Sequence, residues 1–157
     1  MKYKFWDKYG LSAEIRARGV SFKSKPEYPN QILFGVIIDH QPIRPRFFDR
    51  NLTDAEMVSV IKNIINHGNV DERYPMASEI GHITIYKNEA FIYDGLKGDW
   101  IINDFENFND KDDEKNIQPV MTIPSDDLLG ILEDYILWKN TEYQAYKINL
   151  KRRLSEK

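Results

Sequence analysis

An apolar repeat at helical spacing, close to the C-terminal end, is the pattern that most constrains this fold. Large apolar side chains recur there at the spacing of one helix face, at Leu128, Leu132, Tyr135, Ile136, Tyr143, Tyr146, Leu150 and Leu154. The repeat predicts a helix over residues 126–154, which would be about 43 Å long at about 1.5 Å of rise per residue. Because the apolar face of such a helix must be buried, we expect it to pack on a sheet formed by the rest of the chain.

The predicted C-terminal helix has recognisable start and break signals. Ser125 is the expected N-cap, because its hydroxyl can accept a hydrogen bond from a backbone N–H of the first turn. The full length exceeds what a compact domain of this size covers comfortably. Thr141 and Gln144 have the spacing of a capping box, which favours a break near Lys139 and Asn140.

A second helix is predicted over residues 54–67. Thr53 and Glu56 have capping-box spacing at its start, and Gly68 is well placed to end it. Met57 and Ile61 begin an apolar stripe on one side. The pattern therefore indicates a helix that packs one face on a sheet.

The remaining apolar segments predict strands. Alternating or β-branched residues favour strands near residues 3–6, 14–22, 32–39, 81–86, 90–94, 99–103 and 119–123. The run at 32–39 reads as a central strand buried on both faces. Residues 80–103 are expected to form a β-meander, and residues 69–78, which contain Pro75, a polar loop.

These elements predict an α+β fold. Its mainly antiparallel sheet would comprise the N-terminal strands, the meander of residues 80–103 and the strand at 119–123. The helix of residues 54–67 and the long C-terminal helix of residues 126–154 would pack on it. A length of 157 residues is expected to form one domain, 1–157.

Composition excludes several kinds of site. The chain has no cysteine, so disulfides, cysteine-ligated zinc, iron–sulfur clusters and a thiol nucleophile are excluded. No apolar run follows the lysines at the N-terminus, and no run is long enough to cross a bilayer. We therefore expect a cytoplasmic protein that does not bind membranes.

Charge is distributed unevenly along the chain. The formal net charge is −3, with +5 over residues 1–50 and −6 over residues 89–115. We do not expect an acidic chain to bind nucleic acid, because affinity for phosphate needs clustered lysine and arginine. The basic residues of the first third could stack on and contact a single strand, but pairing with the chain's own acids explains them more simply.

The stretch of residues 89–115 combines acids with large aromatic residues. It contains nine acidic residues, three lysines and five aromatic residues, a composition typical of surfaces that hold a basic protein partner. Alternation along the strand at 90–94 would place Phe91 and Tyr93 on one face, so part of this aromatic set is expected in the core. The predicted partner-contact residues are Asp94, Asp99, Trp100, Asp104, Glu106, Phe108, Asp110, Asp112, Asp113 and Glu114.

The sequence supports a catalytic site less strongly than it supports the acidic binding surface. His82, Thr84 and Tyr86 would share one strand face and could act on a ribose hydroxyl and a phosphate, with His40 as a further acid or base. The same row is also what the polar face of a half-exposed strand looks like. The alternative function is thus a small metal-independent ribonuclease or phosphodiesterase that uses His82.

A calcium loop is not supported by the alternating acids that begin at Asp110. An EF-hand would need glycine at its sixth position and glutamate at its twelfth, where this chain has Lys115 and Met121. Nucleotide-binding and acyl-transfer motifs are also missing from the sequence. No metal and no cofactor are expected.

In overall character, the chain resembles the small acidic immunity proteins of bacterial polymorphic-toxin and contact-dependent growth-inhibition systems. The likeness rests on a cysteine-free, aromatic-rich chain of one domain that is acidic over residues 89–115. The resemblance implies that the protein is not an enzyme. It implies a cytoplasmic inhibitor that binds a cognate toxin domain, often a nuclease with a basic cleft. A monomer is expected, and a self-associating structural or regulatory subunit is a further alternative.

Overall fold

The computed structural model describes residues 2–16, 19–23, 36–38, 52–77, 81–94 and 121–156. Its helices are α1 (Lys4–Lys8), α3 (Asp54–His67), α4 (Ser125–Trp138) and α5 (Gln144–Ser155), with a π-helical turn, η2 (Lys139–Tyr143), between the last two. Its strands are β1 (Ser12–Arg16), β2 (Gly19–Lys23), β3 (Val36–Ile38), β4 (Tyr74–Ala77), β5 (Gly81–Ile85), β6 (Glu89–Asp94) and β7 (Met121–Pro124). The chain is an α+β protein, as predicted.

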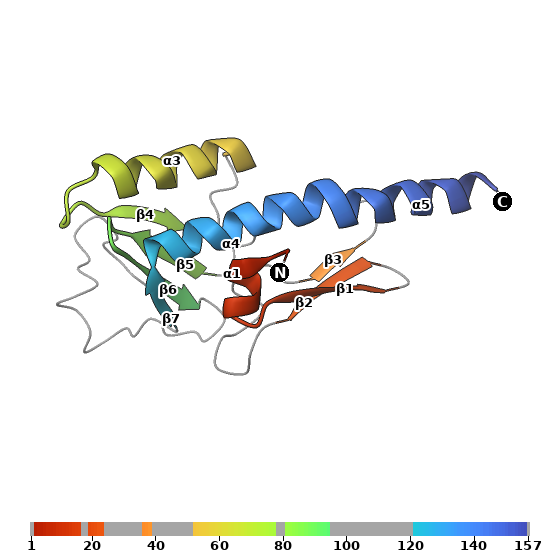
Figure 1. Ribbon diagram of the computed structural model, residues 1–157, viewed down its shortest axis with the longest axis horizontal. Coiled ribbons are helices and arrows are strands. Elements are labelled where there is room, and N and C mark those ends of the chain that lie inside the picture. The colour runs from red at the N-terminus through yellow and green to blue at the C-terminus, as the bar shows by residue number, and fades with distance from the viewer. Residues whose placement is uncertain are drawn as a thin grey trace.

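The strands form two antiparallel sheets. One has the order β1-β2-β3 and the other the order β4-β5-β6-β7. Helices α4 and α5 and the turn between them form one long rod that runs over both sheets, with α3 beside α4 and α1 beneath it (Figure 1). The rod thus connects the two sheets through a shared core.

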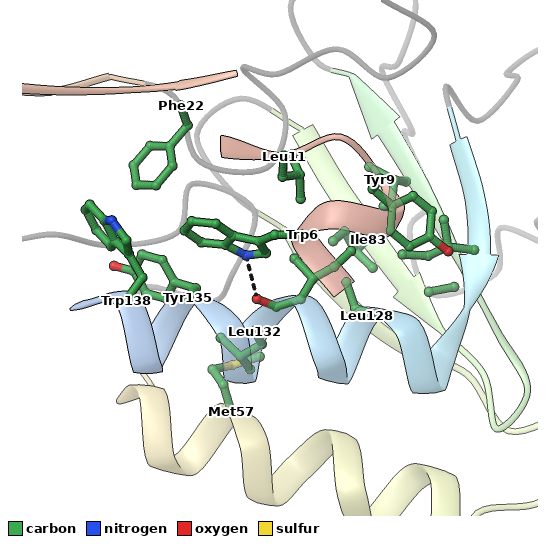
Figure 2. Close-up of a cluster of buried hydrophobic side chains, with 14 of the residues drawn as sticks. Trp6, Tyr9, Leu11, Phe22, Met57, Ile83, Leu128, Leu132, Tyr135 and Trp138 are labelled. Carbon is green, nitrogen blue, oxygen red and sulfur yellow. Dashed lines mark hydrogen bonds between the residues drawn. The ribbon is translucent and has the colours of Figure 1, made fainter. Parts of the chain in front are cut away.

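An aromatic cluster fills the core between α4 and the first sheet. The ring centroids of Trp6 and Phe22 lie 5.9 Å apart, and those of Phe22 and Trp138 lie 5.1 Å apart. Figure 2 shows these rings together with Tyr135, while Met57 from α3 reaches toward Leu132 from the other side of α4. Side chains from α1, β2, α3 and α4 therefore share one core.

The predicted strand over residues 3–6 is wrong, because this segment lies in and just before helix α1. The carboxylate Oδ2 of Asp134 in α4 accepts hydrogen bonds from the backbone N–H groups of Phe5 (2.8 Å) and Trp6 (3.1 Å). These are unpaired donors of the first helical turn, which a local side chain would normally satisfy. A residue distant in the sequence thus caps α1, so no local sequence pattern predicts this helix.

Residues 3–9 as a whole run antiparallel to α4 and η2. Tyr9 donates a hydrogen bond to Asp127, and Tyr3 donates one to Glu142 at the other end. Between them, the indole N–H of Trp6 donates to the carbonyl oxygen of Ile131 at 3.1 Å (Figure 2). Residues 127, 131 and 134 share one helix face by their spacing, so residues 3–9 are fastened along that face.

Two strand predictions change in detail. The alternating segment at 14–22 belongs to two paired strands, β1 and β2, and Gly19 begins the second with a φ of 155°. The predicted loop at 69–78 is wrong for residues 74–77, which form β4. Because β4 is the terminal strand of its sheet, Pro75 can lie in it without removing a donor that a central strand needs.

The predicted meander is correct for two of its three strands. β5 and β6 pair as expected, but the next strand beside β6 is β7, with Phe91 opposite Thr122. That pairing gives the predicted strand at 119–123 its place in the sheet. The predicted strand at 99–103 lies outside the described residues, and of the run at 32–39 the structure describes β3, which pairs with β2.

The expected break in the C-terminal helix is a π-helical turn. Buried Trp138 and Tyr143 are five residues apart, whereas an α-helix would repeat its buried face after three or four. One π turn absorbs the extra residue and keeps the aromatic row on the core side. Thr141 donates to the carbonyl oxygen of Leu137 at 2.7 Å instead of capping a new helix.

Candidate functional site

The acidic stretch begins with β6 and continues into the connection between two neighbouring strands of the second sheet. β6 ends at Asp94, β7 begins at Met121, and the two strands are hydrogen-bonded neighbours. Adjacent antiparallel strands need a connection of only about two to five residues. The chain instead places 26 residues, 95–120, between them, and these include seven acidic residues and three lysines.

Most of the predicted contact residues lie in that connection. Asp94 is the last residue of β6, and the other nine are outside the described residues. The structure therefore defines where this segment is attached: both of its ends join strands of the same sheet.

Strand β6, which immediately precedes residues 95–120, is buried on both faces. Ala90 and Ile92 belong to the main core, whereas Phe91 and Tyr93 form a second cluster with Tyr86. Phe91 is 8% exposed and Tyr93 is 1% exposed, so neither can serve as a surface anchor for a partner. The expectation that part of the aromatic set is core is confirmed for these two residues.

The opposite end of the sheet is fixed to two helices. Ser125 donates from its backbone N–H to the carbonyl oxygen of Asn88 (3.1 Å) and from its hydroxyl to that of Tyr86 (2.5 Å). The ammonium group of Lys87 donates to the carbonyl oxygen of Ile65 at the end of α3 (2.8 Å). Ser125 therefore joins the sheet to α4, and its predicted N-cap bond is not formed; Pro124 occupies the N-cap position.

The row proposed for ribonuclease chemistry is largely buried. Thr84 is 1% exposed and Tyr86 is 6% exposed, which does not fit the polar face of a half-exposed strand. His82 lies in β5 opposite Tyr93, but its side chain is not described, and His40 lies outside the described residues. His67 is exposed in the last turn of α3.

Carboxylates in the described body act mainly as structural acceptors. Asp127 is 7% exposed, accepts from Tyr9 and pairs with Lys8 at 2.7 Å. Asp54 accepts from Lys139 at 2.8 Å and so joins α3 to η2. No local sequence pattern predicts these long-range roles. Within the described ranges, no three acidic, histidine or cysteine residues gather as metal ligands would.

Two tyrosines have perturbed acidities. Burial, followed by the hydrogen bond to Glu142, raises the pKa of Tyr3 above its ordinary value of 10.0. Burial raises the pKa of Tyr135 well above that value, and the nearby Asp54 carboxylate adds to the shift. Both shifts disfavour the phenolate, and the protonated Tyr3 hydroxyl donates its hydrogen bond to Glu142.

Every helix in the described residues is too short or too polar to span a membrane. Comparison of the chain with protein-family models, curated proteins and solved structures gave no match.

Proposed function

We propose that this protein is a cytoplasmic immunity protein, which binds and neutralises a cognate toxin domain through the acidic, aromatic-containing segment at 94–114. One observation carries the proposal. Strands β6 and β7 are paired neighbours in a sheet whose strand β6 is buried on both faces, yet 26 residues with a net negative charge connect them where a short turn would suffice. Connections far longer than the fold requires commonly serve binding.

The charge of the segment specifies the partner's chemistry. Residues 95–120 carry a net charge of −4, so the complementary surface is basic, as is the substrate cleft of a nuclease. Complementary charge accelerates encounter, and Trp100 and Phe108 would supply apolar anchors among the acids. An inhibitor of this kind works stoichiometrically and needs no chemistry of its own.

The test uses the toxin domain encoded beside this protein's own reading frame. Four substitutions, Asp104→Lys, Glu106→Lys, Asp110→Lys and Asp113→Lys, should weaken the complex by about tenfold or more, because each replaces an attraction by a repulsion. Binding is measured by isothermal titration calorimetry, and folding by circular dichroism, which should be unchanged.

The matched control reverses four exposed acids of the described body. Asp7, Asp71, Glu133 and Glu156 are all exposed, and their replacement by lysine changes the net charge equally. If both quadruple variants lose the same affinity, the segment is not the binding site. If the purified protein instead cleaves RNA and His82→Ala abolishes the cleavage, the enzymatic alternative replaces the proposal.

A further inference from the structure

Helix α5 carries an apolar stripe that leaves the core. Tyr146 at its start belongs to the main core and Leu150 packs against that core, but Leu154 near its end is exposed. Figure 1 shows α5 continuing the line of α4 past the body of the molecule. Since most of a helix's stability in a protein comes from packing of its apolar face, a helix extended in this way gains from a partner.

Burial along the stripe falls step by step. Tyr143 is 5% exposed, Tyr146 is 8% exposed, Leu150 is half-buried and Leu154 is 62% exposed. Steps of three, four and four residues place these side chains on one helix face. The rings of Tyr143 and Tyr146 are in contact, with centroids 5.9 Å apart. The core-facing row therefore continues into solvent without a covering element at Leu154.

Basic side chains border this stripe on both sides. At 100° per residue, Lys147 and Lys151 lie along one border and Arg153 along the other. The ammonium group of Lys147 lies 5.6 Å from the ring centroid of Tyr143. Where the structure describes the chain, no ion pair engages Lys151 or Arg153. The stripe is apolar in the middle and positive at its edges.

We propose that the end of α5 is a docking surface for an acidic amphipathic helix of a partner protein. The partner's apolar face would cover Leu150 and Leu154, and its flanking carboxylates would meet Lys147, Lys151 and Arg153, as in a helix pair with opposite flanking charges. The residues of this surface lie outside the acidic segment in the sequence, and the inference does not depend on the proposed function.

Charge and shape favour this occupant over three others. A second copy packed through α5 would oppose lysine and arginine to the same residues, which repel. Nucleic acid would contact the basic borders but leave Leu154 exposed. An interfacial membrane helix needs a broad apolar face, whereas here the row is one residue wide and already enters the core.

The probe is a pair of synthetic peptides of about three heptads, both with leucine at the core positions. One has glutamate at the flanking positions, and the other has lysine. Fluorescence anisotropy of each labelled peptide is measured against the full chain. The glutamate peptide should bind, the lysine peptide should not, and added salt should weaken binding.

Two exposed side chains of α5 provide a matched pair of variants. Leu154→Ser should weaken binding of the glutamate peptide about tenfold, because a buried leucine contact is lost. Ile148 is 59% exposed but lies on another face, so Ile148→Ser should bind as the wild type does. Lys151→Glu combined with Arg153→Glu should reverse the preference between the two peptides.

Four results would overturn the inference. The first is failure of the glutamate peptide to bind the wild type, and the second is an equal effect of Leu154→Ser and Ile148→Ser. The third is a dimer, seen by sedimentation, that Leu154→Ser dissociates. The fourth is binding to phosphatidylserine vesicles that depends on Leu154 while neither peptide binds.

Discussion

At the scale of single residues, Gly130 sets how closely α1 and α4 approach. A Cβ atom at this position would overlap the ring of Phe5. Glycine in the middle of a helix normally costs about 1 kcal/mol relative to alanine. In this helix, that cost is offset by the close packing of α1, which brings the backbone of Phe5 and Trp6 within hydrogen-bonding reach of Asp134.

We predict that Gly130→Ala lowers the free energy of unfolding by about 1–3 kcal/mol, because the new methyl group displaces the ring of Phe5. In a Phe5→Ala background, the same substitution should be neutral or stabilising by up to about 1 kcal/mol, because the helix propensity of alanine then dominates. Urea denaturation of all four proteins measures this coupling. A stabilising effect of Gly130→Ala in the wild type would contradict the packing argument.

At the scale of elements, local signals predicted those structures that depend on local chemistry. The capping box of Thr53 and Glu56 is present, with N–H to oxygen distances of 3.1 and 3.3 Å, and α3 begins where it predicts. Helix α1 was missed because its cap, Asp134, lies 129 residues from Phe5. β4 was missed because Pro75 is compatible with a strand only at a sheet edge, which is a property of the whole sheet.

The same reasoning limits what could be predicted of the candidate site. Composition identified the acidic stretch, but the adjacency of β6 and β7 that makes residues 95–120 an unusually long connection needed the structure. Burial of Thr84, which weakens the enzymatic alternative, also depends on packing that alternation alone does not reveal. The helical repeat likewise places Leu154 on the core side of a long helix, whereas in the structure it is 62% exposed.

The π-helical turn gives a prediction for α4 and α5. Deleting Asn140 should restore α-helical spacing between Trp138 and Tyr143 and keep both rings in the core, so the free energy of unfolding should stay within about 1 kcal/mol of the wild type. Deleting Glu133 from the regular part of α4 should cost more than about 3 kcal/mol, because it rotates Tyr135 and Trp138 away from the core. Thermal denaturation compares the two deletion variants. If both lose the same free energy of unfolding, the π-helical turn does not accommodate an extra residue.

At the scale of the whole molecule, we expect the two-sheet body to fold without residues 95–120. Both sheets and the α3–α4 pair share the core, whereas residues 95–120 join strands that are already neighbours. Replacing this segment by Asn-Gly should preserve cooperative unfolding. The free energy of unfolding should rise by up to about 2 kcal/mol, because a shorter connection costs less closure entropy.

Circular dichroism and denaturation of the Asn-Gly variant check this prediction, with toxin binding as a second measurement. A folded variant that no longer binds would separate scaffold from binding segment. Loss of cooperative unfolding would instead show that residues 95–120 contribute to the core beside Tyr93.

Because residues 3–9 pack along α4, they cannot complete their contacts during synthesis until α4 has been made. Tyr9 bonds to Asp127, 118 positions later, and Tyr3 to Glu142, 139 positions later. At about 5–20 residues per second, residues 3–9 are made many seconds before the helix that caps them. Trp6 lacks its contacts with Ile131 and Trp138 until these residues are made, so the nascent chain exposes apolar surface to which chaperones can bind, and the core closes only when α4 is complete.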